Sequence, residues 1–248
     1  MNAFYKSLFT LILITFIYDA VAQSRETQDL QKDWISSFNQ SGDLQSFYRE
    51  ASGILQESKL ITGSDNIGKK WLEFRGRQGT ITEYKRLETI QLRETSKFEL
   101  GEYLMEKGSR YYTIIGWRNN NGWYKEIEVT HIAVDPGADE TDEIKLLRDS
   151  WQKLANDHRP DLIGKELYTD GGYYFNRGRV YSNRDIADVY SYMNPESFRI
   201  ALEGLSTTIV NEEIAYDIGS FQTNGKGLYI LIWIKKENKW KLLLDFNF

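Results

Sequence analysis

The sequence predicts an α+β protein made of two tandem copies of one small domain. Each copy is expected to carry about three N-terminal helices packed on a strongly curved antiparallel sheet. Helical periodicity opens each half, long strand-like stretches close it, and aromatic residues recur at a nearly constant offset between the halves. Aromatic residues make up 14% of the chain and cysteine is absent. Packed apolar cores rather than disulfides must therefore stabilise both domains.

Residues 1–22 are expected to be a cleavable secretory signal peptide. Lys6 supplies a positive start, residues 8–17 form an apolar run, and Ala20 and Ala22 fit the small-x-small cleavage pattern. The run is shorter than the about 20 residues that cross a bilayer, and no cysteine follows it for lipid attachment. We therefore expect a secreted or periplasmic protein that is not a lipoprotein and has no membrane span after cleavage.

An acidic segment, residues 134–142, separates the two predicted domains. It contains Pro136 and Gly137, which is the chemistry of a linker. The first domain is accordingly assigned to residues 23–133 and the second to residues 143–248. The net charge of −5 combines both signs along the chain, so the sequence carries no basic footprint for nucleic acid.

Apolar residues at helical spacing predict the helices of each half. Trp34 and Trp151 fall at matching places in the first helix of the two halves. The helices expected in this way cover residues 27–39, 64–74, 144–156 and 183–193. Two short strands are expected before the second helix of each half.

Four long strands are expected to close each half. Asn119–Gly122 and Lys236–Lys239 are typical of hairpin turns. In the last strand, apolar residues alternate with Lys241, Asp245 and Asn247, which predicts one buried and one partly polar face. The expected strands cover residues 80–93, 98–107, 110–118 and 122–134, then 198–210, 214–223, 228–236 and 239–248.

Matching residues at the ends of the halves support an internal duplication. They are separated by 116 to 118 residues, and a steady offset over about 100 residues is hard to obtain by chance. The pairs are Gly101 and Gly219, Tyr103 and Phe221, Trp117 and Trp233, and Trp123 and Trp240.

The order of these elements resembles the nuclear-transport-factor-2-like superfamily, which includes ketosteroid isomerases and SnoaL-like polyketide cyclases. The second half carries the better match: Leu167-Tyr168-Thr169-Asp170, Gly178, Asn183 and Ile186 to Tyr190, then Trp240-Lys241-Leu242 and Asp245-Phe246-Asn247. The resemblance covers residues 27–132 and 144–248, and the chain is similar to secreted bacterial members of the superfamily. It implies two cone-shaped domains, each with a pocket under its helices. Because such domains often pair through the outer sheet face, a homodimer or an intramolecular pairing is expected.

The resemblance also indicates where ketosteroid isomerase chemistry would need its groups. The base position falls at Asn176 in the second half and Gln56 in the first, and an amide does not take up a proton at neutral pH. The tyrosine position falls near Trp151 and Trp34, which carry no hydroxyl. The position of the protonated aspartate falls near Ile230, in an apolar strand, where no carboxyl group is present. This reaction is therefore not expected.

Other familiar chemistries also lack their residues. His131 and His158 lie in different halves, and no cysteine–histidine cluster or GxSxG motif is present, so neither a metal nor a cofactor is expected. Asp170 is the preferred catalytic candidate if the protein is an enzyme, because it follows the tyrosine that should end a helix near the pocket mouth. The carboxylates able to reach a pocket are Asp170, Glu212, Glu213, Asp217 and Asp245.

The first hypothesis is a non-catalytic module that binds a small apolar ligand or a protein partner through its cones. It predicts that the second cone is the better binder, lined by Tyr168, Tyr174, Asn176, Tyr190, Tyr216 and Trp233. A SnoaL-like isomerase, cyclase or dehydratase with a non-standard site is the alternative. A structural or dimerisation module whose cones are filled by side chains is a second alternative. Pocket volume and a buried carboxylate separate the three.

Overall fold

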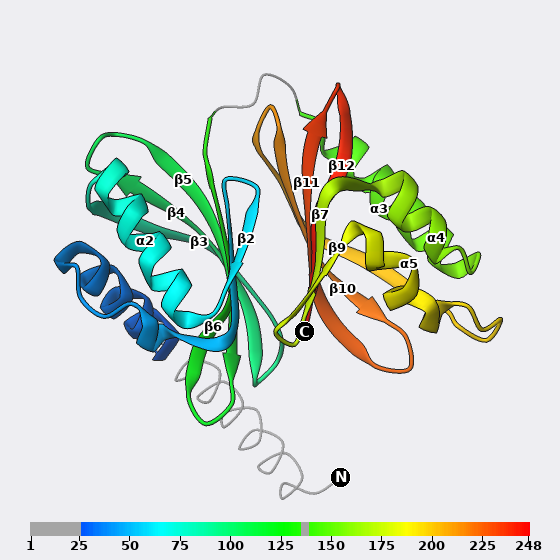
Figure 1. Ribbon diagram of the computed structural model, residues 1–248, viewed down its shortest axis with the longest axis horizontal. Coiled ribbons are helices and arrows are strands. Elements are labelled where there is room, and N and C mark those ends of the chain that lie inside the picture. Colours follow the sequence, from blue (N-terminus) through cyan, green and yellow to red (C-terminus); the bar gives the residue numbers. More distant parts are fainter. Residues whose placement is uncertain (1–25, 135–138) are drawn as a thin grey trace, which may run out of the picture.

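A computed structural model describes residues 26–134 and 139–248, so the predicted signal peptide lies outside the described residues. The chain forms two sheets of six strands, ordered β2-β1-β6-β5-β4-β3 and β8-β7-β12-β11-β10-β9. The two orders are the same, as the predicted duplication requires. Figure 1 shows the two sheets side by side in the middle of the molecule, with the helices of each half on the outer sides.

Each half begins with helices and ends with four long strands, as predicted. The first helix covers residues 26–40. The remaining elements of the first half are η1 (Gln45–Phe47), β1 (Tyr48–Gln56), β2 (Lys59–Thr62), α2 (Ser64–Gln78), β3 (Ile81–Arg93), β4 (Ser96–Met105), β5 (Arg110–Asn119) and β6 (Trp123–Ile132). Those of the second half are α3 (Thr141–Asn156), α4 (Pro160–Leu162), η2 (Ile163–Leu167), β7 (Tyr168–Asn176), β8 (Arg179–Ser182), η3 (Asn183–Asp185), α5 (Ile186–Val189), η4 (Tyr190–Met193), β9 (Ala201–Asn211), β10 (Ile214–Gln222), β11 (Lys226–Lys236) and β12 (Lys239–Asn247).

Strand register repeats between the halves down to individual irregularities. The ladder between β5 and β6 shifts after Gly116, and the ladder between β11 and β12 shifts after Ile232. The next paired residue is a tryptophan in each case, Trp117 opposite Lys125 and Trp233 opposite Leu242. An extra residue at such a bulge bends the strand and reverses which face the following side chains occupy. Both sheets are therefore bent at the same place.

An amide side chain joins the first helix to the sheet in the same way in both halves. Asn39 donates to the carbonyl of Ile81 and accepts from its amide, both at 2.8 Å. Asn156 does the same with Ile200, at 2.9 and 2.8 Å. Both asparagines lie at the end of the helix, where backbone carbonyls lose their intrahelical partners. The repeated bridge fixes the helix over the start of β3 and β9.

The outer faces of the two sheets pack against each other. A single apolar cluster includes residues of both halves, and the ring of Phe98 lies 4.6 Å from that of Phe248 and 6.0 Å from that of Phe246. A polar contact also joins the two sheets, since His131 Nδ1 of the first half lies 3.0 Å from the Tyr216 hydroxyl of the second. The central strands of both sheets are thus buried on two faces, one under helices and one under the other sheet. The edge strands β3 and β9 are more exposed.

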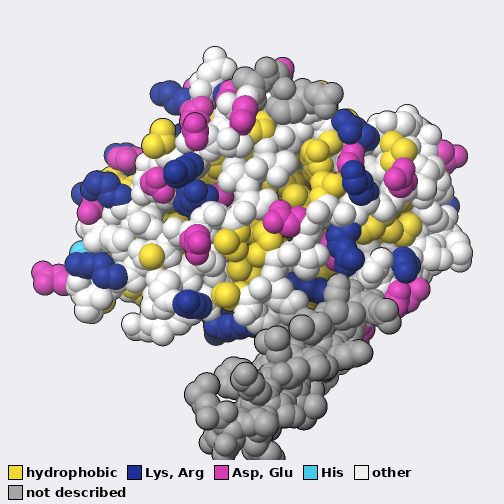
Figure 2. Space-filling model, turned by 180° about the vertical axis from the view of Figure 1, so that it is seen from behind, with side chains coloured by type: hydrophobic (Ala, Val, Ile, Leu, Met, Phe, Trp, Pro, Cys, Tyr) yellow, Lys and Arg dark blue, Asp and Glu magenta, His cyan; other side chains and the backbone are white. Residues whose placement is uncertain are grey.

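Within residues 26–134 and 139–248, no helix has the length and apolar character needed to cross a membrane. On the face shown in Figure 2, hydrophobic side chains form patches between Lys, Arg, Asp and Glu side chains of both signs. This mixture agrees with the modest net charge and gives that face no field of a single sign.

Candidate functional site

A cavity of about 510 Å³ lies under the helices of the second half. This is within the 300–1,000 Å³ range of small-molecule sites. Its walls come from α3, β7, η4, the segment before β9 and the strands β9 to β12. The lining residues are Trp151, Tyr174, Asn176, Tyr190, Tyr192, Pro195, Ser197, Phe198, Arg199, Ile200, Leu202, Phe221, Thr223, Asn224, Tyr229, Leu231, Asp245 and Asn247.

A shorter covering helix helps to leave this space open. In the first half, α2 has 15 residues and buries Trp71 and Phe74 over the sheet, with the Trp71 ring 5.0 Å from that of Trp34. The corresponding α5 has 4 residues and is flanked by the short 3-10 helices η3 and η4, so the helical segment covers only residues 183–193. After η4, residues 194–200 form neither helix nor strand, and several of them line the cavity.

Smaller side chains in the sheet enlarge the same space. Strand register places Leu202 opposite Phe221 where the first half has Tyr84 opposite Tyr103. The Tyr103 ring lies 5.8 Å from that of Trp34, so it fills the first cone. Leu202 and Phe221 carry no hydroxyl, and both line the cavity of the second half.

The carboxyl group of Asp245 is the buried acid of this cavity. Asp245 is only 4% exposed, and its Oδ2 accepts a hydrogen bond of 2.5 Å from the Tyr190 hydroxyl. The Tyr168 hydroxyl lies 2.8 Å from that of Tyr190. Tyr168 also hydrogen-bonds the Asp245 carboxyl group. The three side chains thus form one hydrogen-bonded cluster centred on the carboxyl group.

Burial controls the protonation state of the Asp245 carboxyl group and of the tyrosine hydroxyls beside it. It raises the pKa of Asp245 to about 7, while the hydrogen bonds from Tyr190 and Tyr168 act in the opposite direction. Burial and the nearby Asp245 raise the pKa of Tyr190 well above its ordinary value, so Tyr190 remains a donor. A carboxyl group that changes protonation near neutral pH can hold a cation or transfer a proton.

Amide groups surround a second hydroxyl of the cavity. Asn176 donates to the Tyr174 hydroxyl at 2.6 Å, and Asn247 donates to it at 3.3 Å. The Tyr174 ring lies 5.1 Å from that of Tyr190 in an edge-to-face arrangement. The cavity wall is therefore rich in aromatic side chains, and β7 and β12 contribute polar groups to it.

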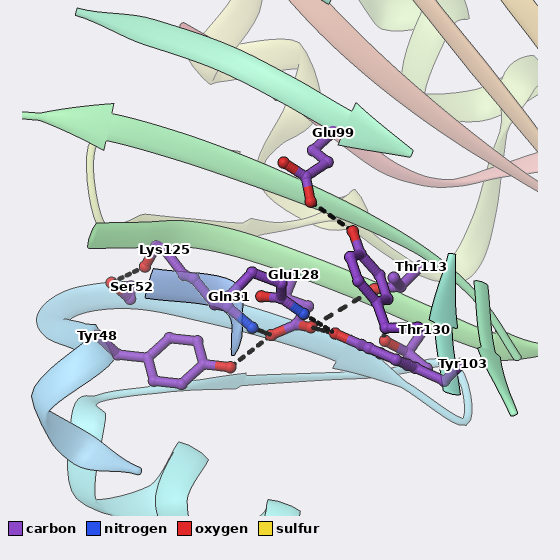
Figure 3. A network of polar contacts seen from close by, with 10 residues as sticks. Gln31, Tyr48, Ser52, Glu99, Tyr103, Thr113, Lys125, Glu128 and Thr130 are labelled. Carbon is purple, nitrogen blue, oxygen red and sulfur yellow. Dashed lines mark hydrogen bonds and ion pairs between the residues drawn. The ribbon is translucent and has the colours of Figure 1, made fainter. Parts of the chain in front are cut away.

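The interior of the first cone contains a buried ion pair (Figure 3). Glu128 accepts from Lys125 at 3.0 Å, from Tyr103 at 2.8 Å and from Tyr48. Gln31 of the first helix donates to the Tyr103 hydroxyl at 2.8 Å. Lys125 and Glu128 are both fully buried. Burial lowers the pKa of Lys125 to about 8 against the pull of Glu128, so the lysine is still protonated at pH 7.

Register makes the two buried acids equivalent. Glu128 pairs with Ile54 of β1, and Asp245 pairs with Tyr174 of β7, at the same step of each ladder. Lys125 pairs with Tyr48 in the first half, and Leu242 pairs with Tyr168 in the second. The two cones thus share an acid and a tyrosine. They differ at the position of Lys125, which pairs with Glu128 in the first half and is Leu242 in the second.

Three of the residues predicted to line the second cone do so, namely Tyr174, Asn176 and Tyr190. Tyr168 is buried and contacts the cavity residue Tyr190 through its hydroxyl. Trp233 faces the same side of the sheet but is fully buried in the core beneath the helices, outside the cavity lining.

Two predicted positions are corrected. Tyr216 lies on the opposite face of β10, where its hydroxyl meets His131 and the carbonyl of Tyr112 in the first half. It therefore belongs to the contact between the sheets, because side chains alternate along a strand and Ala215 takes the helix-covered side. Asp170 is exposed within the irregular part of β7, outside the cavity lining.

Asp245 is one of the five candidate carboxylates, and no residue pattern distinguishes it from the other four. The alternation in the last strand favoured a solvated Asp245, but the β11–β12 bulge reverses the strand's faces. Leu242 and Asp245 therefore lie on the cone side, whereas Leu244 and Phe246 lie against the other sheet. The internal duplication held the missing signal, since an offset of 117 places Asp245 on Glu128.

The other buried acid of the second half, Asp217, is held by a side chain of α3. Its Oδ1 accepts from Arg148 at 2.7 Å and from Thr207 at 3.2 Å. This ion pair connects α3 to β10. Among the residues that the structure describes, no group of three or more His, Asp or Glu side chains is placed to hold a metal ion.

Comparisons with known proteins give no family assignment. No protein-family model matches the chain, and no curated protein matches it. Similar solved structures include a nuclear transport factor 2-like protein of unknown function from Shewanella oneidensis, at 13% identity and a TM-score of 0.39, covering 44% of this chain and 98% of the other.

Two further structures match about half of this chain. A hexachlorocyclohexane dehydrochlorinase (LinA, type 2) is 11% identical, with a TM-score of 0.38 and coverage of 47% of this chain and 89% of its own. A DUF4783 family protein from Bacteroides uniformis is 12% identical, with a TM-score of 0.33 and coverage of 39% and 90%. These similar structures include a nuclear-transport-factor-2-like protein. The repeated six-stranded order with helices before the long strands gives the two tandem domains that the sequence predicted.

Proposed function

We propose that this chain is an exported binding protein whose second domain encloses a small, largely apolar molecule and whose first domain is its structural support. The observation that carries the proposal is the difference between the cones. One holds a cavity of about 510 Å³ with an aromatic wall and a buried carboxyl group, whereas the other holds a closed ion pair, Lys125 with Glu128.

The composition of the cavity wall supports a mainly apolar ligand. Aromatic and aliphatic side chains such as Trp151, Phe221 and Leu231 make up most of it, and Asn176 and Asp245 are among its polar groups. Ligand sites commonly combine an apolar wall with a few polar groups that orient the ligand. The packing of the two sheets stabilises the second domain from behind and leaves its cavity side unobstructed.

Fluorine-detected NMR screening of the purified mature chain against a library of small fluorinated aromatic fragments tests this proposal. Leu202→Trp should fill the cavity and abolish fragment binding, because Leu202 lines it. Leu205→Trp on the same strand is the matched control, since Leu205 is 44% exposed and outside the lining. Fragments that bind equally to both variants, or no binding fragment at all, would contradict the proposal.

A second candidate function is acid–base catalysis by Asp245 inside the same cavity. The observation in its favour is the pKa of about 7 that burial gives this carboxyl group, because a general acid or base works best when its pKa lies near the working pH. Asp245→Asn separates the two functions. An enzyme loses turnover of its ligand in this variant, whereas a binding protein returns the ligand chemically unchanged in both forms, as NMR of the recovered ligand would reveal.

Export is part of the proposal and has its own measurement. The signal-like residues 1–22 support a mature chain that begins at Gln23 or within about three residues of it. Mass spectrometry of the protein recovered outside the cytoplasm gives that terminus directly. Recovery of the chain with Met1 still attached would contradict this part.

A further inference from the structure

The first cone encloses an alkylammonium ion that the chain itself supplies. The Nζ atom of Lys125 lies 3.0 Å from the Glu128 carboxylate and 3.6 Å from the centre of the Trp34 ring. The rings of Tyr48 and Trp117 lie 5.7 and 5.8 Å from the same atom. A carboxylate on one side and aromatic faces on the others are the groups that hold a desolvated ammonium ion.

The second cone has equivalents of the residues that surround this ammonium ion in the first cone. Strand register and the matching helices place an acid, two tryptophans and a tyrosine at the same positions. The pairs are Glu128 and Asp245, Trp34 and Trp151, Trp117 and Trp233, and Tyr48 and Tyr168.

The second cone lacks the ion itself. Leu242 stands where the first half has Lys125, and Ala215 stands where it has Lys97. Among the described residues, none of the ion pairs involves Asp245. Arg199 is the cationic residue of the cavity wall, but it is exposed and donates to the carbonyls of its own segment.

From this comparison we infer that the cavity of the second half binds a primary amine with an apolar body, its ammonium group against Asp245. The inference rests on the proposed binding function and specifies its ligand class. The ammonium group would meet Asp245 with Trp151 and Tyr190 nearby, as Lys125 meets Glu128 in the other half. The body would lie against Leu202 and Phe221.

Proton release is a signature specific to this ligand class. Burial holds the Asp245 carboxyl group partly protonated near pH 7. An ammonium ion beside it favours the carboxylate, so binding at pH 7 should release a fraction of a proton. A neutral ligand that only fills the cavity has no reason to release one.

Calorimetric titration of the mature chain at pH 7 with 2-phenylethylamine, 2-phenylethanol and phenylacetate tests the inference. The three probes share the phenyl body and differ in the polar end. The amine should bind at least tenfold more tightly than the alcohol, with an enthalpy that varies with the ionisation enthalpy of the buffer. Phenylacetate should bind least, because its carboxylate would face Asp245.

Three variants identify the site. Asp245→Asn should lower the affinity for the amine at least tenfold and leave that for the alcohol within a factor of two. Leu242→Lys should abolish amine binding by supplying the first half's cation, whereas Leu242→Met keeps the volume and should preserve it. Circular dichroism checks that each variant is folded, and Asp245→Asn carries the test if Leu242→Lys is not.

The outcomes separate this inference from the binding function on which it rests. Equal binding of amine and alcohol, or an amine affinity unchanged in Asp245→Asn, overturns the inference and leaves a neutral-ligand site. Binding of none of the probes, together with no hit in the fragment screen, overturns both.

Discussion

The two halves of this chain share strand order, bulges and helix anchors, yet one cone is filled and the other is hollow. The filled cone contains Lys125, Glu128 and Tyr103 in one hydrogen-bonded cluster. The hollow cone keeps the acid as Asp245 and replaces the lysine with Leu242. A single fold can therefore serve as support or as a container, depending on which few side chains reach its centre.

The largest expected effect comes from removing the cation of the filled cone. Lys125→Met should lower the free energy of unfolding by about 3–5 kcal/mol, because it leaves Glu128 buried without its partner. Urea denaturation measures this loss. Leu242→Met at the equivalent position of the hollow cone is the control and should cost less than about 1.5 kcal/mol, since the volume is nearly conserved.

A double variant checks the physical reason for that loss. Lys125→Met with Glu128→Gln removes both charges together, so most of the lost stability should return. A double variant as unstable as Lys125→Met would mean that Lys125 acts through packing and not through its charge.

The contact between the sheets should respond to acid. Burial lowers the pKa of His131 to about 4 from an ordinary 6.5, so the unfolded chain binds a proton below pH 6.5 that the folded chain refuses until about pH 4. The contribution of His131 to the free energy of unfolding is thus fully present above pH 6.5. About 3 kcal/mol of it is lost as the pH falls from 6.5 to 4. His131→Gln should flatten this part of the stability profile, and an unchanged slope would contradict the assignment.

The hollow cone should respond in the opposite direction. The folded pKa of Asp245 is raised to about 7 from an ordinary 3.8, so its contribution is complete below pH 3.8 and is lost as the pH rises through 7. Asp245→Asn should therefore stabilise the protein at pH 8, by about 2 kcal/mol, and change little at pH 4. Because Asp245 faces the cavity, solvent screening reduces the effect below the full pKa difference. Urea midpoints at the two pH values measure it.

The smallest effects should be equal in the two halves. Asn39→Ala and Asn156→Ala each remove two hydrogen bonds between a helix end and a strand, at a cost of about 1–2 kcal/mol. Hydrogen exchange of the amides of Ile81 and Ile200 measures the local loss. A large effect in one half only would mean that the two bridges are not equivalent.

Periodicity was sufficient to predict the element order and the duplication. Trp34 and Trp151 repeat on helices, and the long strands end within a few residues of the predicted positions. The sheet face that each residue occupies was not predictable from the sequence, because β10 and β11 are apolar on both faces. Tyr216 was therefore placed on the wrong side. The bulge before Trp233 is likewise invisible in the residue pattern, and it hid the inward position of Asp245.

The covalent link between the sheets has a consequence for how the molecule behaves at low abundance. A pair of separate subunits falls apart on dilution, whereas a short tether holds its ends at an effective concentration in the millimolar range. The back-to-back contact, with Phe98 against Phe248, therefore persists at any dilution. It also fixes the stoichiometry at one hollow cone per chain. Ligand titration should accordingly follow a simple hyperbola for one site, with no dependence on protein concentration.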